Sequence, residues 1–193
     1  MAIFDFGIQS IDIKNTRSKH EDTDYVAFTL RLGSLDPQTL VQPLGNLNSG
    51  VVKPPLYLSF NEVELSLDDS VSFNYLIVNA GSASSAQVEA ALKATGSAWA
   101  KGQGPQSANF TGALSDEQTW FNNELKSILN PKSCDGMVAA EQDHFQYGDL
   151  VTMIANGPFN HQTNHPGVRS PSGCGPNSQY TVTWGIQADG PLQ

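Results

Sequence analysis

Apolar and polar residues alternate along several short stretches of this sequence, a period that is typical of β-strands with one buried face. Within residues 25–32, for example, Val26, Phe28 and Leu30 point to one side and alternate with more polar neighbours. Residues 71–78 end in a run that is apolar on both faces, which favours a central, covered strand. Strands are predicted at residues 4–13, 25–32, 56–60, 63–67, 71–78, 136–140, 150–155 and 180–186.

Two stretches have the helical period instead. Ser84 and Gln87 have the spacing of a capping box, apolar residues follow at helical intervals, and Gly96 supplies a C-terminal stop. A similar pattern predicts a second helix over residues 115–130, which Asn130-Pro131 ends. We expect both apolar stripes to face the core.

Three long connections, at residues 33–55, 96–112 and 156–178, separate these elements and are rich in Gly, Pro and polar residues. About eight strands with intervening turn signals suit an antiparallel two-sheet sandwich, with a barrel as the alternative. One or two short helices are inserted in this mainly β fold. No repeat or boundary divides the chain, so residues 1–193 are expected to form a single domain.

The charge balance excludes some partners. The formal net charge is −9 and the sequence pI is about 4.7. Nucleic acid and anionic membranes are recognised by clustered Lys and Arg, which this chain lacks. No stretch reaches the ~20 apolar residues of a membrane-spanning helix, so we expect a soluble, acidic protein without a transmembrane segment.

The two cysteines, Cys134 and Cys174, both lie in segments with turn-forming neighbours. A disulfide between them would contribute about 4 kcal/mol by restricting the unfolded chain. Disulfides persist in oxidising compartments, which favours an extracellular location. The N-terminus does not have the pattern of a signal peptide, so the protein is either cytoplasmic or has lost a leader.

An acidic segment between two predicted strands has the residue types of a cation site. Glu21, Asp22 and Asp24 place three carboxylates within four residues. Because Ca²⁺ takes six to eight oxygen ligands, further oxygens must come from another segment, for which Asp143 and Asp149 are the candidates. A bound divalent cation also suits the negative charge of the chain.

The run Asp22-Thr23-Asp24-Tyr25-Val26 resembles the first calcium loop of C2-type β-sandwich domains, in which an Asp-Pro-Tyr-Val run ends an acidic loop. That resemblance implies calcium binding. It covers fewer than a dozen residues, Thr23 does not match, and no proline precedes Tyr25. The second acidic loop of that family is not found, so the chain is not assigned to it. The alternative is a solvated turn in which Lys19 and His20 balance the carboxylates.

Histidines and one tryptophan supply further candidates for ligand binding. His144 follows Asp143 directly, whereas His161 and His165 are four residues apart in a segment expected to be a loop. Trp99 lies beyond the predicted helix stop, and an exposed ring there would stack on a sugar. The ligand-binding candidates are therefore His20, Trp99, His144, His161 and His165.

Three classes of function remain open. The first is a ligand-binding sandwich module, calcium-dependent or not, for a carbohydrate or another small or surface ligand. The second is a small enzyme without a standard motif, such as a metal-dependent lyase, hydrolase or cyclase that uses loop His and Asp side chains. The third is a secreted interaction or structural protein. The sequence does not define the oligomeric state.

Overall fold

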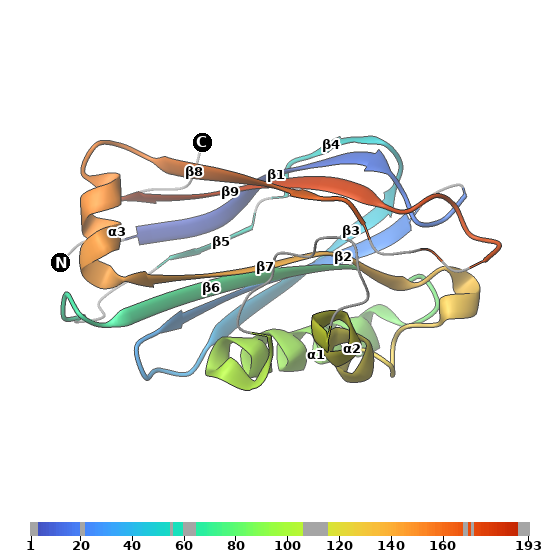
Figure 1. Cartoon of the computed structure of the whole chain (residues 1–193), viewed down its shortest axis with the longest axis horizontal. Helices are drawn as coiled ribbons and strands as arrows, with labels where there is room; N and C mark the ends of the chain where they lie inside the picture. The colour runs from blue at the N-terminus through green and yellow to red at the C-terminus, as the bar shows by residue number, and fades with distance from the viewer. Residues whose placement is uncertain are drawn as a thin grey trace.

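The computed structural model describes residues 4–19, 22–54, 56–59, 65–105, 116–167, 170 and 172–188, which form two antiparallel sheets packed face to face (Figure 1). Sheet A has the order β4 (Gly50–Val52), β1 (Phe4–Asn15), β9 (Gln179–Ala188) and β8 (Phe159–His165), and β5 (Leu56–Ser59) also pairs with β1. Sheet B has the order β3 (Gln38–Leu47), β2 (Asp22–Leu32), β6 (Ser70–Asn79) and β7 (Gly136–Gln146). The predicted two-sheet sandwich is confirmed, and the barrel alternative is not formed.

Aromatic side chains join the two sheets at the centre of the sandwich. The ring centroids of Phe73 on β6 and Trp184 on β9 are 4.1 Å apart. Phe28 of sheet B and Phe6 of sheet A pack against Phe73 at 6.0 and 6.3 Å. All four side chains are buried, as the alternating pattern of their strands predicts.

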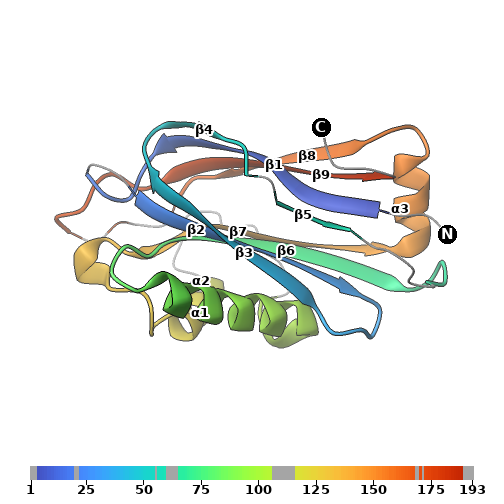
Figure 2. The ribbon, with the colours of Figure 1, turned by 180° about the vertical axis from the view of Figure 1, so that it is seen from behind.

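A helical layer covers the outer face of sheet B, whereas none of the described helices covers the outer face of sheet A (Figures 1 and 2). The layer contains α1 (Ser85–Ala98), the π-helical turn η1 (Trp99–Gln103) and α2 (Asp116–Glu124). The capping box of Ser84 and Gln87 is confirmed. No helix within the described ranges is long and apolar enough to cross a membrane.

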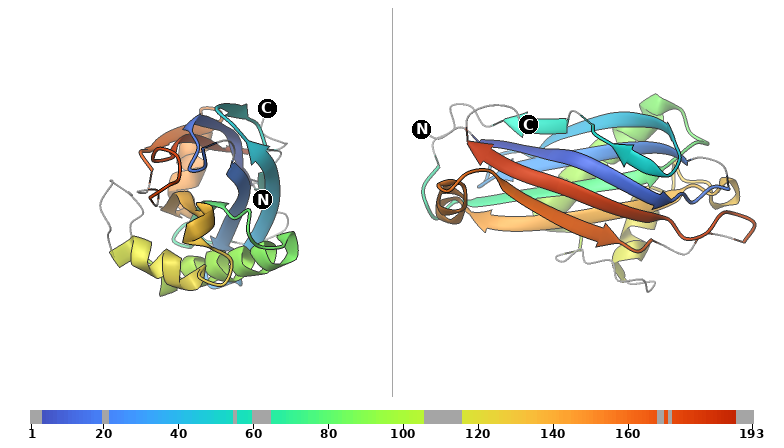
Figure 3. Two further views of the ribbon diagram at one scale, coloured as in Figure 1. Left: turned by 90° about the vertical axis from the view of Figure 1, so that its right-hand side faces the viewer. Right: turned by 90° about the horizontal axis from the view of Figure 1, so that it is seen from above.

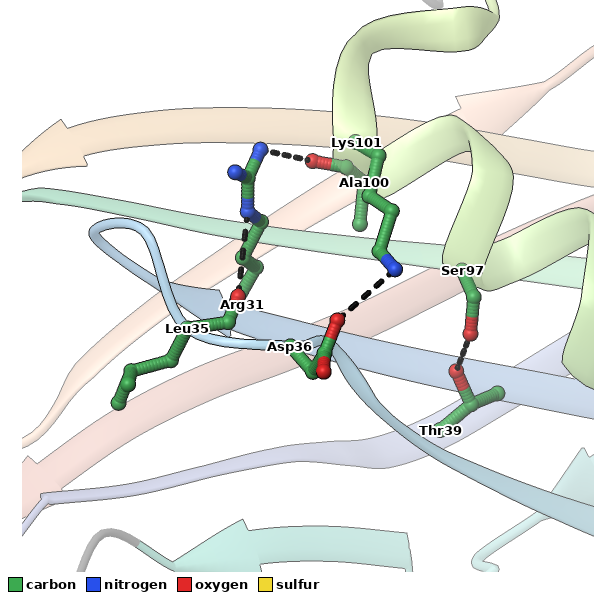
Figure 4. A network of polar contacts seen from close by, with 7 residues as sticks. All are labelled: Arg31, Leu35, Asp36, Thr39, Ser97, Ala100 and Lys101. Atoms are coloured by element: carbon green, nitrogen blue, oxygen red, sulfur yellow. Dashed lines mark hydrogen bonds and ion pairs between the residues drawn. The ribbon is translucent and has the colours of Figure 1, made fainter.

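Side chains of sheet B bind the carbonyl groups at the C-terminal end of α1, where helical partners run out. Arg31 Nη1 donates to the Ala100 carbonyl at 3.1 Å, and Asn74 Nδ2 donates to the Gly96 carbonyl at 3.4 Å. Figure 4 shows the Arg31 contact together with the ion pair between Lys101 and Asp36. The Arg31 and Asn74 hydrogen bonds hold the helical layer on β2 and β6 of sheet B.

Gly96 does not end α1, contrary to the expectation from sequence, because the helix continues to Ala98 and then into η1. The glycine is needed for close packing on sheet B instead. A Cβ atom at residue 96 would lie 2.4 Å from Thr29 Oγ1, closer than real Cβ contacts allow.

The segment that connects the two sheets beyond β7 also differs from the prediction. Residues 150–155 were expected to form a strand, but they belong largely to α3 (Tyr147–Ile154), which closes one end of the sandwich (Figure 3). Leu150, Met153 and Ile154 all pack on the core, and their spacing is that of a helix face.

Three strands lie in connections that were expected to be irregular. β3 and β4 lie within residues 33–55, and β8 lies within residues 156–178. β3 and β8 are edge strands, and neither has a continuous apolar face, so the alternation that reveals a half-buried strand is missing from their sequences. A short 3-10 turn, η2 (Pro131–Ser133), precedes β7.

We predict that Gly96→Ala destabilises the protein, although the same change usually stabilises a helix by up to ~1 kcal/mol. Overpacking against Thr29 should lower the free energy of unfolding by about 1–3 kcal/mol, measured by chemical denaturation. Thr29→Ala removes the contacting atom, so the double variant should lose less stability than the sum of the single variants. Additive losses would contradict the contact.

Candidate functional site

The predicted disulfide is present between Cys134 and Cys174, whose Cα atoms are 5.6 Å apart. It joins the segment before β7 to the connection between β8 and β9, at the end of the sandwich opposite α3. The same end contains Asp22 and Asp24, the two residues of the predicted calcium segment that the structure describes. His20 and Glu21, the other two candidates from that segment, lie outside the described residues.

Asp22 is fully buried, and donors from the protein surround its carboxylate. Its Oδ2 atom accepts the backbone N–H of Arg17 at 2.6 Å, and its Oδ1 atom accepts that of Ser18 at 2.7 Å. Asn79 Nδ2 donates to Oδ1 as well, at 3.0 Å. The carboxylate therefore organises the turn between β1 and β2 from the inside.

Asp24 is also fully buried, and its surroundings favour the neutral carboxylic acid. Burial, together with the nearby charge of Asp22, raises the pKa of Asp24 to about 8, against the lowering effect of the Tyr180 hydrogen bond. The Tyr180 hydroxyl donates to Asp24 Oδ2 at 2.6 Å, whereas Oδ1 makes no hydrogen bond. Asp24 thus binds Tyr180 as a largely uncharged group at neutral pH.

The guanidinium of Arg17 supplies a positive charge beside the buried carboxyl groups of Asp22 and Asp24. Arg17 is 4% exposed, and its Nε atom donates to the Cys134 carbonyl at 3.1 Å. Burial lowers the pKa of Arg17, and the nearby carboxylates of Asp22 and Asp135 partly offset this lowering. Gly136 leaves room for the guanidinium, because a Cβ there would lie 2.7 Å from it.

The described acidic residues of the two predicted ligand segments, Asp22 and Asp24 in one and Asp143 and Asp149 in the other, do not come together. Asp24 pairs with Asn79, and Asn79 pairs with Gly136, the first residue of β7. Asp143 is seven residues further along β7, or roughly 20 Å at the rise of a strand. Asp149 is exposed in the first turn of α3, where a negative charge suits the helix dipole. Among the described residues, no group of three or more His, Cys, Asp and Glu is arranged to hold a metal.

A second polar group, on the side of the sandwich where β7 faces β8, is the more unusual feature (Figure 1). Both are edge strands, one from each sheet, and α3 connects them. Their inward faces place carboxylates opposite imidazoles where a sandwich interior is normally apolar. We call this group the β7–β8 polar strip. It contains Tyr75, Glu141, Asp143, His161, Thr163 and His165.

Glu141 lies at the centre of the strip and is held by three neighbours. Its Oε2 atom accepts the Tyr75 hydroxyl at 2.6 Å, and its Oε1 atom accepts the Thr163 hydroxyl at 2.7 Å. His161 Nε2 is 3.7 Å from Oε1, and 46% of the His161 side chain is exposed. A buried carboxylate with two hydroxyl donors and one imidazole is thereby fixed in place.

Tyr75 extends this hydrogen-bond chain to His165. The Tyr75 hydroxyl lies 2.7 Å from His165 Nε2. Since the Glu141 carboxylate only accepts, the tyrosine proton points to Glu141, and His165 Nε2–H donates to the tyrosine oxygen. Burial lowers the pKa of His165 to about 4, so the imidazole is neutral at pH 7.

Asp143 and Trp184 leave polar atoms unsatisfied on the same side. Asp143 Oδ2 and Trp184 Nε1 are both buried and make no hydrogen bond. Asp143 pairs across the strands with Phe73, whose ring packs on Trp184. Burial and the charge of Glu141 raise the pKa of Asp143 to about 6, which His161 partly offsets. One carboxylate acceptor and one indole donor are thus buried on this side of the sandwich without a hydrogen-bond partner among the described residues.

Three sequence candidates, Asp143, His161 and His165, meet in this strip, although the last two were expected in a loop. On β8 their spacing of four residues places both imidazoles on one face. His144 lies on the opposite face of β7 from Asp143, and much of its side chain is exposed. The part of the ring that the protein covers is desolvated, which lowers the pKa of His144.

Trp99 is not an exposed sugar platform. It is completely buried, because the chain continues from α1 into η1 and turns the ring back toward the sheet. Its Nε1 atom donates to the Pro105 carbonyl at 2.8 Å, and its ring packs edge-on against Phe121.

Sequence reasoning missed the roles of Tyr75, Trp184 and Thr163, because each looks like an ordinary strand residue. The usable signal was the pair Glu141 and Asp143, which stand two residues apart just beyond the predicted strand at residues 136–140. A comparison with models of known protein families and with curated proteins finds no match for this sequence. The site is therefore interpreted from its geometry.

We predict that Asp24→Asn makes stability less dependent on pH between 6.5 and 8. The folded-state pKa of Asp24 is raised to about 8, so the native protein retains a proton that the unfolded chain loses. The wild-type free energy of unfolding should fall as pH rises through this window, by on the order of 1 kcal/mol. The variant should lose less over the same range. Denaturant titrations at several pH values check this, and equal slopes would contradict it.

We also predict that Asp22→Ala lowers the free energy of unfolding by about 2 kcal/mol or more, because two buried backbone N–H groups lose their acceptor. The loss should be the same in EDTA and in Ca²⁺ if the carboxylate acts only within the fold. Asp36→Ala, which removes an exposed carboxylate, is the matched control. Calcium stabilisation of the wild type that is absent only from Asp22→Ala would identify Asp22 as a metal ligand.

Proposed function

We propose that this protein is a carbohydrate-binding β-sandwich module whose site is the β7–β8 polar strip. The observation that supports this most directly is the pair of buried, unsatisfied groups, Asp143 Oδ2 and Trp184 Nε1. Buried polar atoms without a partner are rare in folded proteins, and such an atom is expected to serve a role.

The chemistry of these two atoms favours a hydroxyl group. The indole N–H only donates and the carboxylate only accepts, whereas a hydroxyl does both. Sugar hydroxyls would accept from Trp184 Nε1 and donate to Asp143 Oδ2. Glu141 adds a negative charge two residues away on the same face of β7. Carboxylates facing hydroxyl donors form the stronger, charge-assisted kind of hydrogen bond.

The rings beside the strip supply the apolar part of such a site. Phe159 and His161 lie two residues apart on β8, and their ring planes are within 11° of parallel. Trp184 is 5.4 Å from His161 and 5.6 Å from Phe159, measured between ring centroids. The C–H faces of a sugar pack on aromatic rings of this kind, while the hydroxyls take the polar contacts.

The proposal also includes an extracellular location and a site that does not require calcium. A disulfide is stable in oxidising surroundings, which supports an extracellular setting where glycans are accessible. Calcium dependence, suggested by the acidic segment, stays a prediction. We propose a site that does not need the ion, since protein donors surround Asp22 and a hydrogen-bonded tyrosine contacts Asp24.

We predict that Asp143→Asn weakens saccharide binding by about tenfold or more. The change keeps the shape of the side chain but removes the charged acceptor, and such a hydrogen bond contributes about 1.5–3 kcal/mol. Binding is measured by a glycan array followed by calorimetry on the saccharides that bind, in EDTA and again in Ca²⁺. The fold should be unaffected, because Asp143 Oδ2 has no protein donor to lose.

The matched control is Asp36→Asn, which makes the same chemical change at the exposed turn between β2 and β3. It should bind as the wild type does. Equal affinity of Asp143→Asn and wild type would contradict the site, and binding of no saccharide would contradict the function. Cleavage of a bound oligosaccharide would instead indicate the enzyme alternative, because Asp143 with its raised pKa lies beside Glu141.

A further inference from the structure

A small pocket lined by residues of β1, β8 and β9 offers a different chemistry from the polar strip. It has a volume of about 230 Å³, and the three strands that contribute to it are neighbours in sheet A. Sites for whole drug-sized ligands occupy roughly 300–1,000 Å³. This pocket, which we call the Lys14 pocket, therefore suits a single chemical group or one sugar ring.

Two residues of the pocket wall are anchored from inside the sandwich. Tyr180 and His165 pair with each other across β9 and β8, and both line the pocket. The Tyr180 hydroxyl is held by Asp24 at 2.6 Å, and His165 Nε2 is held by the Tyr75 hydroxyl at 2.7 Å. The wall is thus fixed by contacts inside the sandwich, and a fixed site binds with a smaller entropic cost.

The remaining uncharged polar side chains of the lining are two amides and a hydroxyl, all of which contain N–H or O–H donors. The Thr181 hydroxyl donates to Asn164 Oδ1 at 2.7 Å, which leaves the Asn164 Nδ2 group free to donate to a ligand. Gln179 is exposed at the same end of β9. None of the lining residues is acidic, and Asp12, which pairs with Thr181 across the strands, does not line the pocket.

Among the described lining residues, Lys14 is the one that carries a positive charge. The register of β1 against β9 shifts between Ile13 and Asn15, so Lys14 is the extra residue of a β-bulge. Bulges redirect a side chain relative to the regular strand. Within the described part of the chain its ammonium group forms no ion pair, in a protein that carries a net charge of −9.

We propose that the Lys14 pocket binds one oxyanionic group of a ligand, a carboxylate or a sulfate, through Lys14, Asn164 and Gln179. An ammonium and two amide donors match the several acceptor oxygens of such a group. If the proposed function also holds, the ligand class is an acidic saccharide, with hydroxyls at the β7–β8 polar strip and the acidic group across β8. That extension rests on the proposed function, whereas the oxyanion pocket does not.

The test is an NMR titration of the whole protein with sodium glucuronate, glucose 6-sulfate and neutral glucose at constant ionic strength, because exposed charges are screened by salt. We expect the acidic sugars to shift the side-chain amide signals of Asn164 and Gln179 to saturation, and glucose to shift them much less. A response to glucuronate alone assigns a carboxylate and a response to the sulfate alone assigns a sulfate ester. Both results support the pocket.

Lys14→Met should raise the dissociation constant for the acidic sugar by about tenfold, as expected for the loss of one charge-assisted hydrogen bond. Lys14→Arg keeps the charge and should restore most of the affinity. Lys93→Met removes an equal charge from the exposed face of α1 and should change nothing. Lys14 is itself exposed, so its replacement should leave the fold intact.

Wild-type affinity in Lys14→Met, or no selective response of Asn164 and Gln179, would overturn the proposal. These outcomes differ from failure of the proposed function. If the protein binds no neutral saccharide but still responds to glucuronate, the sugar site is contradicted and the oxyanion pocket is supported. If Asp143→Asn weakens saccharide binding but Lys14→Met does not, the sugar site is supported and the oxyanion pocket is contradicted.

Discussion

The contact between Phe73 and Trp184 is the point from which the interior of the sandwich is organised. These rings, 4.1 Å apart, join sheet B to sheet A, and Phe6 and Phe28 pack around Phe73. Because the aromatic centre supplies the cohesion between the sheets, the β7–β8 side does not need to be apolar. Inward-facing charged groups on edge strands also discourage pairing with other chains, so the polar strip has a structural advantage besides any role in binding.

Buried ionisable groups occur in two regions of the molecule, and they have different roles in each. At the disulfide end, Asp22 and Arg17 use their hydrogen bonds to hold turns together, and Asp24 stays largely neutral against Tyr180. Along the β7–β8 side, Glu141 is satisfied but Asp143 is not. The contrast matters because a satisfied buried carboxylate stabilises its surroundings, whereas an unsatisfied one is costly unless something binds it.

The central strands and the capping box were predictable from sequence because each depends on local pattern. The strands around Phe28, Phe73 and Trp184 alternate clearly, and their burial follows from that alternation. β8 was not predictable, since its polar residues face both solvent and Glu141. The meeting of Asp143 with His161 depends on which strands become edges, which is a property of topology. Asp22 and Asp24 were recognised as unusual, but their orientation toward the interior depends on Tyr180, which is more than 150 residues away in sequence.

The pairing of β1 with β9 also constrains the order in which the chain can assemble. One edge of β1 receives β4 and β5, which come from the first third of the chain, but its other edge bonds to β9, the last strand of the described residues. Sheet B draws on the nearby β2, β3 and β6, so much of it can pair while the end of the chain is still being synthesised. Until β9 arrives, the aromatic side chains of β1 and β6 lack Trp184, and a newly made chain exposes them to other molecules. The chain segment that completes the interior therefore also ends the period in which aggregation competes with folding.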